Sequence, residues 1–307
     1  MKSFPAATMR ALDRRTIDEY GIPGIVLMEN AGTALTHEIL RFVSGMRNPE
    51  FMILAGKGNN GGDALIAAGQ LFSKQYPVTL FMAARPDELT GDAAEAFEEL
   101  PQKLKEQIQC DFTADSIGEN AVLVDGLLGT GIRGALREPF ATWIRIINDS
   151  RNPVVSIDLP SGLNADDGSA DCCVTADLTV TMAAVKTGML VGKGPNASGR
   201  IVVARIGIPD RCLEEAGGDY ELFTRQDARN LLRREPFNTY KNRRGHLGIV
   251  GGSSDYGSAP FLSAEAALRT GAGLVTVLIP ASATGAAACF GWQASAGRTS
   301  ASHWQPS

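Results

Sequence analysis

Gly56-Lys57-Gly58-Asn59-Asn60-Gly61-Gly62-Asp63 follows directly after the apolar run Phe51-Met52-Ile53-Leu54-Ala55. An apolar run that ends in a glycine-rich, polar segment is typical of a buried strand that turns into a helix. Two later segments repeat this arrangement, each after its own apolar run and each with an aspartate: 125–134 (DGLLGTGIRG) and 158–162 (DLPSG). Because ligands bind beyond the carboxyl ends of the strands of an open α/β sheet, we expect the three segments to meet at one site.

The rest of the chain extends this pattern. Helical periodicity marks segments near 8–20, 26–42, 63–74 and 88–109, and Thr8 or Asp13 is expected to cap the first of them. Strands that alternate with helices form a largely parallel sheet covered on both faces. We therefore predict an α/β fold over residues 1–220, a Rossmann-like three-layer sandwich with a mostly parallel sheet, with further strands near 78–82, 121–124, 154–157, 177–182 and 201–206.

Composition argues against several classes of protein. The 307 residues carry a net charge of −5 with a pI near 5.4, which argues against a nucleic-acid partner held by its phosphates. No apolar run reaches the roughly 20 residues that span a membrane, and the N-terminus lacks the apolar core of a signal peptide. The five cysteines are odd in number and are not spaced as metal ligands, so we predict a reduced, cytoplasmic protein. Nothing in the sequence decides between a monomer and a homo-oligomer.

A second unit is expected from about residue 225. A basic, turn-prone stretch at 240–245 leads into a strand at 247–250, a helix near 259–270 and a strand at 274–279. One such βαβ unit is too small to build a sufficient core of its own. Residues 282–307 contain no Leu, Ile, Val, Met or acidic residue, and we expect them to be a disordered or non-native tail.

The first glycine-rich segment allows two interpretations. The spacing Gly56-x-Gly58-x-x-Gly61 formally matches the dinucleotide-binding fingerprint, although a simple tight turn explains it as well. The next strand ends in Met82-Ala83-Ala84-Arg85 and supplies no carboxylate for a ribose hydroxyl, which disfavours a plain dehydrogenase. The side-chain oxygens of Asn59, Asn60 and Asp63 suit a cation or a polar ligand better.

The two later segments carry different chemistry. Residues 129–134 (GTGIRG) offer successive backbone N–H groups, the Thr130 hydroxyl and the Arg133 guanidinium, a combination that suits phosphate. Asp125 would repel a phosphate at close range, so we interpret it as a cation ligand, with capping of its own loop as the alternative. Asp158, near Ser161 in the third segment, is a candidate general acid or base, with loop capping again as the alternative.

These segments resemble a known family. Gly58–Asp63, Val124–Gly131 and Ile157–Gly162 are similar to the signature segments of the NAD(P)H-hydrate epimerases, the YjeF N-terminal family, over about residues 5–215. Leu27–Gly32 and Lys186–Gly188 fit the same family. Residues 240–253 and 266–275 resemble the start of an ADP-dependent NAD(P)H-hydrate dehydratase domain. The chain as a whole therefore resembles the front part of a bifunctional NAD(P)H-hydrate repair enzyme, with residues 225–281 as an incomplete, ribokinase-like dehydratase segment.

The resemblance implies an isomerase that interconverts the R and S forms of hydrated NADH and NADPH, with bound potassium (K+). Residues at the positions of the family's metal ligands are Asn60, Asp125 and Ser161. Residues at its substrate-binding positions are Asn59, Asn60, Gly61, Gly62, Asp63, Gly129, Thr130, Gly131, Ile132, Arg133, Gly134, Ala135 and Asp158. The sequence departs from the family at Ala64, where a glycine is usual.

For the catalytic acid or base we choose Asp158, with Asp63 as the alternative. Lys186 is a third possibility, although a lone lysine is more often a surface or phosphate contact. ADP would serve only the dehydratase, a lyase that we expect to be inactive here because its domain is incomplete. The main alternative function is a non-catalytic nucleotide-binding or scaffold module of the same fold, which would have no need of Asn60, Asp63, Asp125, Asp158 and Ser161 together.

Overall fold

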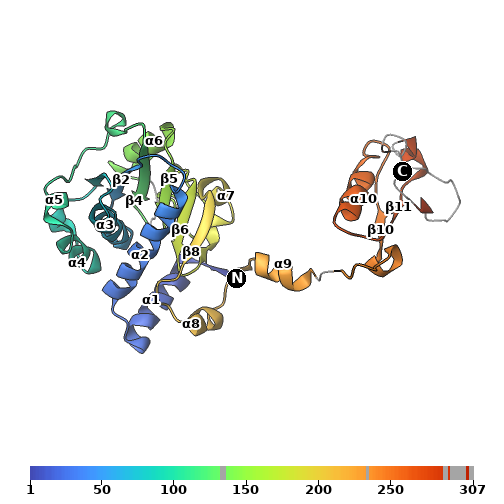
Figure 1. Ribbon diagram of the computed structural model, residues 1–307, viewed down its shortest axis with the longest axis horizontal. Helices are drawn as coiled ribbons and strands as arrows, with labels where there is room; N and C mark the ends of the chain where they lie inside the picture. The colour runs from blue at the N-terminus through green and yellow to red at the C-terminus, as the bar shows by residue number, and fades with distance from the viewer. Residues whose placement is uncertain (132–135, 233–234, 286–289, 291–301, 304–307) are drawn as a thin grey trace. The chain divides into compact units, whose positions relative to one another are not determined.

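The computed structural model describes residues 1–131, 136–232, 235–285, 290 and 302–303 (Figure 1). The chain divides into two units, Met1–Thr224 and Arg225–Ser307. The first unit holds a six-stranded sheet and a small three-stranded sheet, and the second unit holds another small sheet.

The six-stranded sheet of the first unit is parallel throughout, in the order β3-β2-β4-β5-β6-β8. The predicted α/β fold with a largely parallel sheet is therefore confirmed. The chain passes from β2 outward to β3 and then returns to the other side of β2, so the strand order reverses between β2 and β4. Ligands bind at such a reversal in open α/β sheets. The strands are β2 (Glu50–Ala55), β3 (Val78–Met82), β4 (Ala121–Gly126), β5 (Val154–Ile157), β6 (Leu178–Met182) and β8 (Arg200–Ala204).

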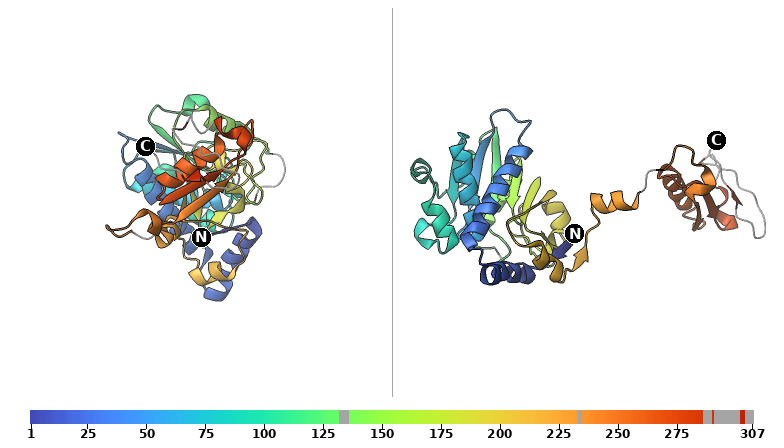
Figure 2. Two further views of the ribbon diagram at one scale, coloured as in Figure 1. Left: turned by 90° about the vertical axis from the view of Figure 1, so that its right-hand side faces the viewer. Right: turned by 60° about the horizontal axis from the view of Figure 1, so that its bottom comes forward.

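Helices cover both faces of this sheet (Figure 2). Alternate residues of a strand face opposite sides, and in β2 the side chains of Phe51 and Ile53 join one core cluster while Met52 and Leu54 join the other. The first cluster contains residues of α1, α2 and α3, and the second contains Trp143 of α6. The helices of this unit are α1 (Ala6–Tyr20), α2 (Gly24–Phe42), α3 (Asn59–Ser73), α4 (Asp92–Glu98), α5 (Gln102–Lys105), α6 (Phe140–Asp149), α7 (Gly194–Ala197) and α8 (Asp210–Glu215).

Several predicted boundaries were wrong for local reasons. The first helix begins at Ala6 after Pro5, so neither Thr8 nor Asp13 caps it. The segment 88–109 is not one helix, because Gly91 (φ +58°) precedes α4 and Pro101 precedes α5. The helix predicted from residue 63 begins at Asn59, so the polar residues of the first glycine-rich segment form its first turn. The helix α6 was not predicted.

A second, smaller sheet in the first unit was also missed. It has the order β7-β1-β9, from β7 (Val185–Lys186), β1 (Lys2–Phe4) and β9 (Tyr220–Glu221). The strand β1 pairs in parallel with β7, where Phe4 lies opposite Lys186. The start of the chain thus fixes the backbone of Lys186, and α1 follows immediately.

The second unit contains the predicted strand–helix–strand arrangement. The strands β10 (His246–Val250) and β11 (Leu274–Leu278) pair in parallel around α10 (Ala259–Arg269), and β12 (Ser302–His303) pairs antiparallel with β11. Its buried core cluster is small and consists of Phe261, Ala264, Val275 and Val277. Most of the predicted tail 282–307 lies outside the described residues.

The remaining elements are short. The helix α9 spans Arg225–Leu231, and 3-10 turns span Pro86–Glu88, Ala114–Ser116, Thr187–Met189, Lys241–Arg244 and Ala281–Ala283.

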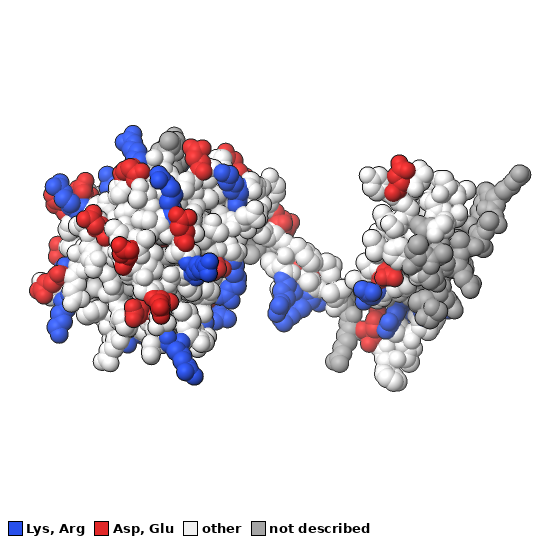
Figure 3. Space-filling view, turned by 90° about the horizontal axis from the view of Figure 1, so that it is seen from above, with Lys and Arg blue, Asp and Glu red and all other residues white. Residues whose placement is uncertain are grey.

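The surface of the first unit is mixed in charge. Acidic and basic side chains are interspersed on the face that Figure 3 shows, so the net negative charge is not gathered into one patch there. Within the described parts of the chain, no helix combines the length and the hydropathy that crossing a membrane requires.

Candidate active site

A cavity of about 510 Å³ opens at the carboxyl ends of the strands, beside the point where the strand order reverses. Its walls come from α1, α2, the start of α3, the loop after β4, and the residues that follow β5 and β6. All three glycine-rich segments contribute to it or lie directly against it. The predicted site residues that line the cavity are Asn59, Asn60, Asp63, Gly129, Thr130, Gly131 and Asp158.

Other predicted residues lie behind the wall of the cavity. Gly61 and Gly62 are buried in the first turn of α3, where a Cβ atom on Gly61 would meet Gly56 O at 1.9 Å and one on Gly62 would meet Met28 Sδ at 2.4 Å. These glycines let the helix start against its neighbours. Asp125 and Ser161 are both fully buried. The predicted residues Ile132, Arg133, Gly134 and Ala135 lie outside the described residues.

The start of α3 and the loop after β4 form a backbone wall. A Cβ atom on Gly56 would lie 1.9 Å from Leu127 O, so only glycine allows the two loops to approach this closely. The first turn of α3 follows Gly58, and no side chain caps it. The free N–H groups of a helix N-terminus favour an anion. This wall can therefore hold the phosphates of a nucleotide.

Asp125 lies at the centre of a buried polar network. Its Oδ2 accepts hydrogen bonds from Ser156 Oγ (2.8 Å) and Ser161 N (2.9 Å), and its Oδ1 accepts from Ser161 Oγ (2.5 Å) and Leu127 N (3.3 Å). Burial raises the pKa of Asp125, and the hydrogen bonds from these three residues oppose that rise. These four hydrogen bonds fix the orientation of the Asp125 carboxylate.

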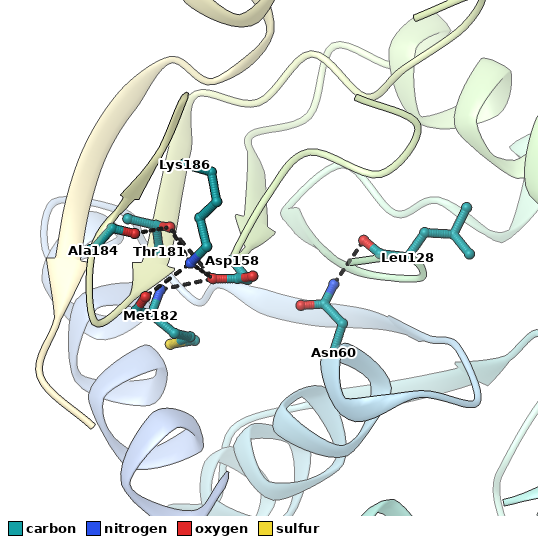
Figure 4. A network of polar contacts seen from close by, with 7 residues as sticks. All are labelled: Asn60, Leu128, Asp158, Thr181, Met182, Ala184 and Lys186. Atoms are coloured by element: carbon teal, nitrogen blue, oxygen red, sulfur yellow. Dashed lines mark hydrogen bonds and ion pairs between the residues drawn. The ribbon is translucent and has the colours of Figure 1, made fainter. Parts of the chain in front are cut away.

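The neighbouring Asn60 leaves one oxygen without a partner. Its Nδ2 donates to Leu128 O at 3.1 Å (Figure 4). The same carbonyl lies 3.1 Å from Ser161 Oγ. Its Oδ1 is buried and has no hydrogen bond among the described residues. Buried polar atoms are rarely left unpaired. A cation that takes oxygen ligands, placed beside Asn60, Asp125 and Ser161, would give Asn60 Oδ1 a partner.

Asp158 and Lys186 form a buried ion pair (Figure 4). Asp158 Oδ1 accepts from Lys186 Nζ and from Met182 N (2.9 Å), and Lys186 Nζ also donates to Thr181 Oγ1 (3.0 Å) and Met182 O (2.9 Å). The Lys186 side chain is only 2% exposed and lines the cavity, so Lys186 is not a surface contact. No described residue donates to Asp158 Oδ2. Asp158 also has a left-handed backbone (φ +62°), a conformation that is uncommon outside glycine and often marks functional positions.

Two further carboxylates face this pair across the cavity lining. Asp63 is 8% exposed, and burial together with the charge of Asp158 raises its pKa well above the ordinary value. Asp13, on α1, is partly buried, and burial raises its pKa to about 6, against an opposing effect of Lys186. Both carboxyl groups therefore hold a proton more readily than an ordinary aspartate. Sequence reasoning missed Asp13, although its place among Met9, Leu12 and Thr16 on the buried face of a helix was a usable signal.

Comparisons with known proteins identify the family of this chain. The family described as the YjeF-related protein N-terminus matches residues 24–188. Proteins named bifunctional NAD(P)H-hydrate repair enzyme Nnr are similar to the chain: one from Moorella thermoacetica is 39% identical over 285 residues (90% of this chain, 53% of that protein), and one from Salinibacter ruber is 36% identical over 296 residues (88% and 53%). The chain spans about half the length of these relatives. The crystal structure of the yeast protein YNL200c shows the same fold, with a TM-score of 0.58 and 18% identity over 74% of this chain and 98% of that one.

Proposed function

Because this chain belongs to the YjeF-related N-terminal family, we propose that it interconverts the R and S forms of hydrated NADH and NADPH. One observation carries the proposal: a carboxylate held by a buried lysine, Asp158, shares a cavity with a protonatable carboxyl group, Asp63. Epimerisation at the hydroxylated C6 carbon needs one group that gives a proton to a leaving hydroxyl and one that takes a proton from an entering water.

The two aspartates divide these roles. Asp63 in its neutral form donates a proton to the C6 hydroxyl, the C–O bond breaks with its electron pair on oxygen, and the ring nitrogen lone pair forms a double bond to C6. Water then adds to the other face of C6, the electron pair returns to nitrogen, and the free Oδ2 of Asp158 takes the proton. Lys186 donates to Oδ1 of Asp158 and leaves Oδ2 turned to the cavity to accept it. The substrate and the product have the same oxidation state, so no redox step is required.

The backbone wall holds the rest of the dinucleotide. Gly129, Thr130 and Gly131 line the cavity beside the N-terminus of α3, which suits the pyrophosphate. Asn59, the first residue of α3, lines the same cavity. Binding energy from these remote groups orients C6 between the carboxylates, and orientation supplies much of the rate.

Potassium would be held by Asn60, Asp125 and Ser161. The unpaired Asn60 Oδ1 supports this assignment, since a hard cation takes oxygen ligands. When bound, the cation would supply positive charge near residues 127–131, the loop after β4. Leu128, in that loop, donates from its backbone N to Ser161 Oγ at 2.8 Å, so the loop and the cation site are coupled.

The test is an assay with mixed R and S hydrates and a separate ADP-dependent dehydratase that removes the S form. The wild-type protein should convert the R form, and Asp158→Asn should lower that rate by roughly 10²- to 10⁴-fold while the hydrate still binds. Asp171→Asn, an exposed position further along the same loop, is the matched control. Near-normal turnover by Asp158→Asn would contradict its role. Binding of the hydrate without turnover by the wild type would favour the alternative, a non-catalytic nucleotide-binding or scaffold module.

A further inference from the structure

The helix α1 brings a third carboxylate into the cavity, one that the scheme above does not use. Asp13 lines the cavity together with Asp63, Asp158 and Lys186, and these four groups come from four different parts of the fold. Asp13 interacts electrostatically with both Asp158 and Lys186, and Asp63 interacts with Asp13. The four side chains therefore form one coupled cluster.

The cluster is short of positive charge, and two of its carboxyl groups lack hydrogen bonds to the described residues. Three carboxylates face one ammonium group, and like charges in a partly closed cavity resist full ionisation. Asp63, more than nine-tenths buried, makes no hydrogen bond or ion pair to any other described residue, and the same holds for Asp13. A buried carboxyl group without a protein partner, at a cavity wall, is placed to exchange a proton with what enters the cavity.

We propose that Asp13 returns the proton from Asp158 to Asp63 after each epimerisation, so that α1 supplies a relay for the reaction. This inference rests on the proposed function. One turnover leaves Asp63 ionised and Asp158 protonated, and the hydroxyl lost from one face of C6 is replaced by water on the other. Asp13 takes the proton from Asp158 Oδ2 through cavity water and passes it to the Asp63 carboxylate, which restores the starting state with no net gain or loss of protons. The reverse epimerisation runs the same steps backward.

Asp13 suits this task better than its neighbours. It is more exposed than Asp63, so it can exchange protons with water, and its pKa of about 6 lies close to neutral pH. A group transfers protons best when its pKa lies near the working pH. The charged groups that face it are Asp63 from α3, Asp158 from the loop after β5 and Lys186 from β7, with Arg10 on its own helix and Lys57 and Asp92 elsewhere in the lining.

The relay is tested in the full chain with Asp13→Asn, a neutral side chain of the same shape. In dilute buffer kcat should fall by about 10-fold, short of the roughly 10²- to 10⁴-fold loss of a group that acts on the substrate directly. Added imidazole, a small proton carrier, should restore kcat in proportion to its concentration. Asp18→Asn, on the exposed side of the same helix, should keep wild-type kcat with no response to imidazole, and Asp13→Glu should retain most of the activity.

Several outcomes would overturn the relay. Wild-type kcat for Asp13→Asn in dilute buffer would do so, as would a loss that neither imidazole nor Asp13→Glu restores, because that pattern belongs to a structural residue. A second measurement does not depend on turnover: carboxyl ¹³C NMR should show Asp13 titrating at about pH 6, and a titration at the ordinary 3.8 would overturn the relay even if the protein is an active epimerase. If the wild type converts no hydrate, the proposed function fails and the relay fails with it.

Discussion

Replacing Asp13 with asparagine should make the protein more stable as the pH rises, even though we expect the same change to slow the reaction. Burial raises the pKa of Asp13 from 3.8 to about 6, so the folded protein binds a proton there more tightly than the unfolded chain does. Ionising the group in the folded state therefore opposes folding. The two pKa values differ by about 2, which at about 1.4 kcal/mol for each pH unit amounts to about 3 kcal/mol.

The pH dependence follows from the same two values. Below pH 3.8 the carboxyl group is neutral in both the folded and the unfolded state, so Asp13→Asn does not change the free energy of unfolding. Between pH 3.8 and about 6 the variant becomes progressively more stable than the wild type, and above that range the difference in free energy of unfolding is constant. We expect an advantage of roughly 1 kcal/mol at about pH 4.5 and about 3 kcal/mol at about pH 8.

Trp143 offers the reporter for this measurement. It is 3% exposed in the core of the first unit, and Trp292→Phe with Trp304→Phe would leave it as the single tryptophan. Urea unfolding followed by its fluorescence, at a series of pH values, gives the free energy of unfolding of that unit. Asp18→Asn, made in the same background, should show no such trend. An advantage of Asp13→Asn that does not change between the two ends of the pH range would refute the reasoning, because it would show that the Asp13 charge carries no folding penalty.

Three further predictions concern other parts of the molecule. Lys186→Met removes the ammonium group that pairs with Asp158 and should lower the free energy of unfolding by about 3–5 kcal/mol. Lys193→Met, at an exposed site, should change the free energy of unfolding little in the same urea assay. Asp125→Asn should weaken potassium activation of the epimerase, measured against sodium; an unchanged potassium affinity would make Asp125 a structural residue. Limited proteolysis should cut between about residues 215 and 245 and leave an N-terminal fragment with full epimerase activity, since α9 has no buried residue; ADP-dependent loss of the S hydrate from the intact chain would contradict the expected lack of dehydratase activity.

The parallel sheet could be predicted because its signals are local. Each central strand is an apolar run that ends in glycine or a polar residue, and the period of the pattern identifies strands and helices before any contact is known. The positions of Asp125 and Asp158 followed from the same rule, since Asp125 is the last residue but one of β4 and Asp158 directly follows β5. The start of α3 was misplaced because its first turn is rich in asparagine and glycine, which favour turns and caps over helix interiors; here close packing of Gly61 against Gly56 overrides that preference.

The groups that complete the site could not be predicted in the same way. Lys186 is buried because β7 pairs with β1, a contact between the two-residue strand and the start of the chain, and strands this short carry no periodicity. From its neighbours in the sequence alone, Asp13 is predicted to cap a helix. Its meaning depends on Asp63 and Asp158, which are distant in sequence and reach it only through the fold.

The fold places Asp63 and Asp125, two residues of the same type, in different environments. Both are buried, and burial raises the pKa of each. Asp125 accepts four hydrogen bonds, which favour its charged form and fix its oxygens. Asp63 accepts none from the described residues and faces other carboxylates, so its neutral form is favoured and its proton is free to move. Different environments around like groups are how one site obtains different roles from one residue type. The difference in hydrogen-bond donors, more than the shared burial, therefore supports the proposed roles, with Asp125 in binding and Asp63 in proton transfer.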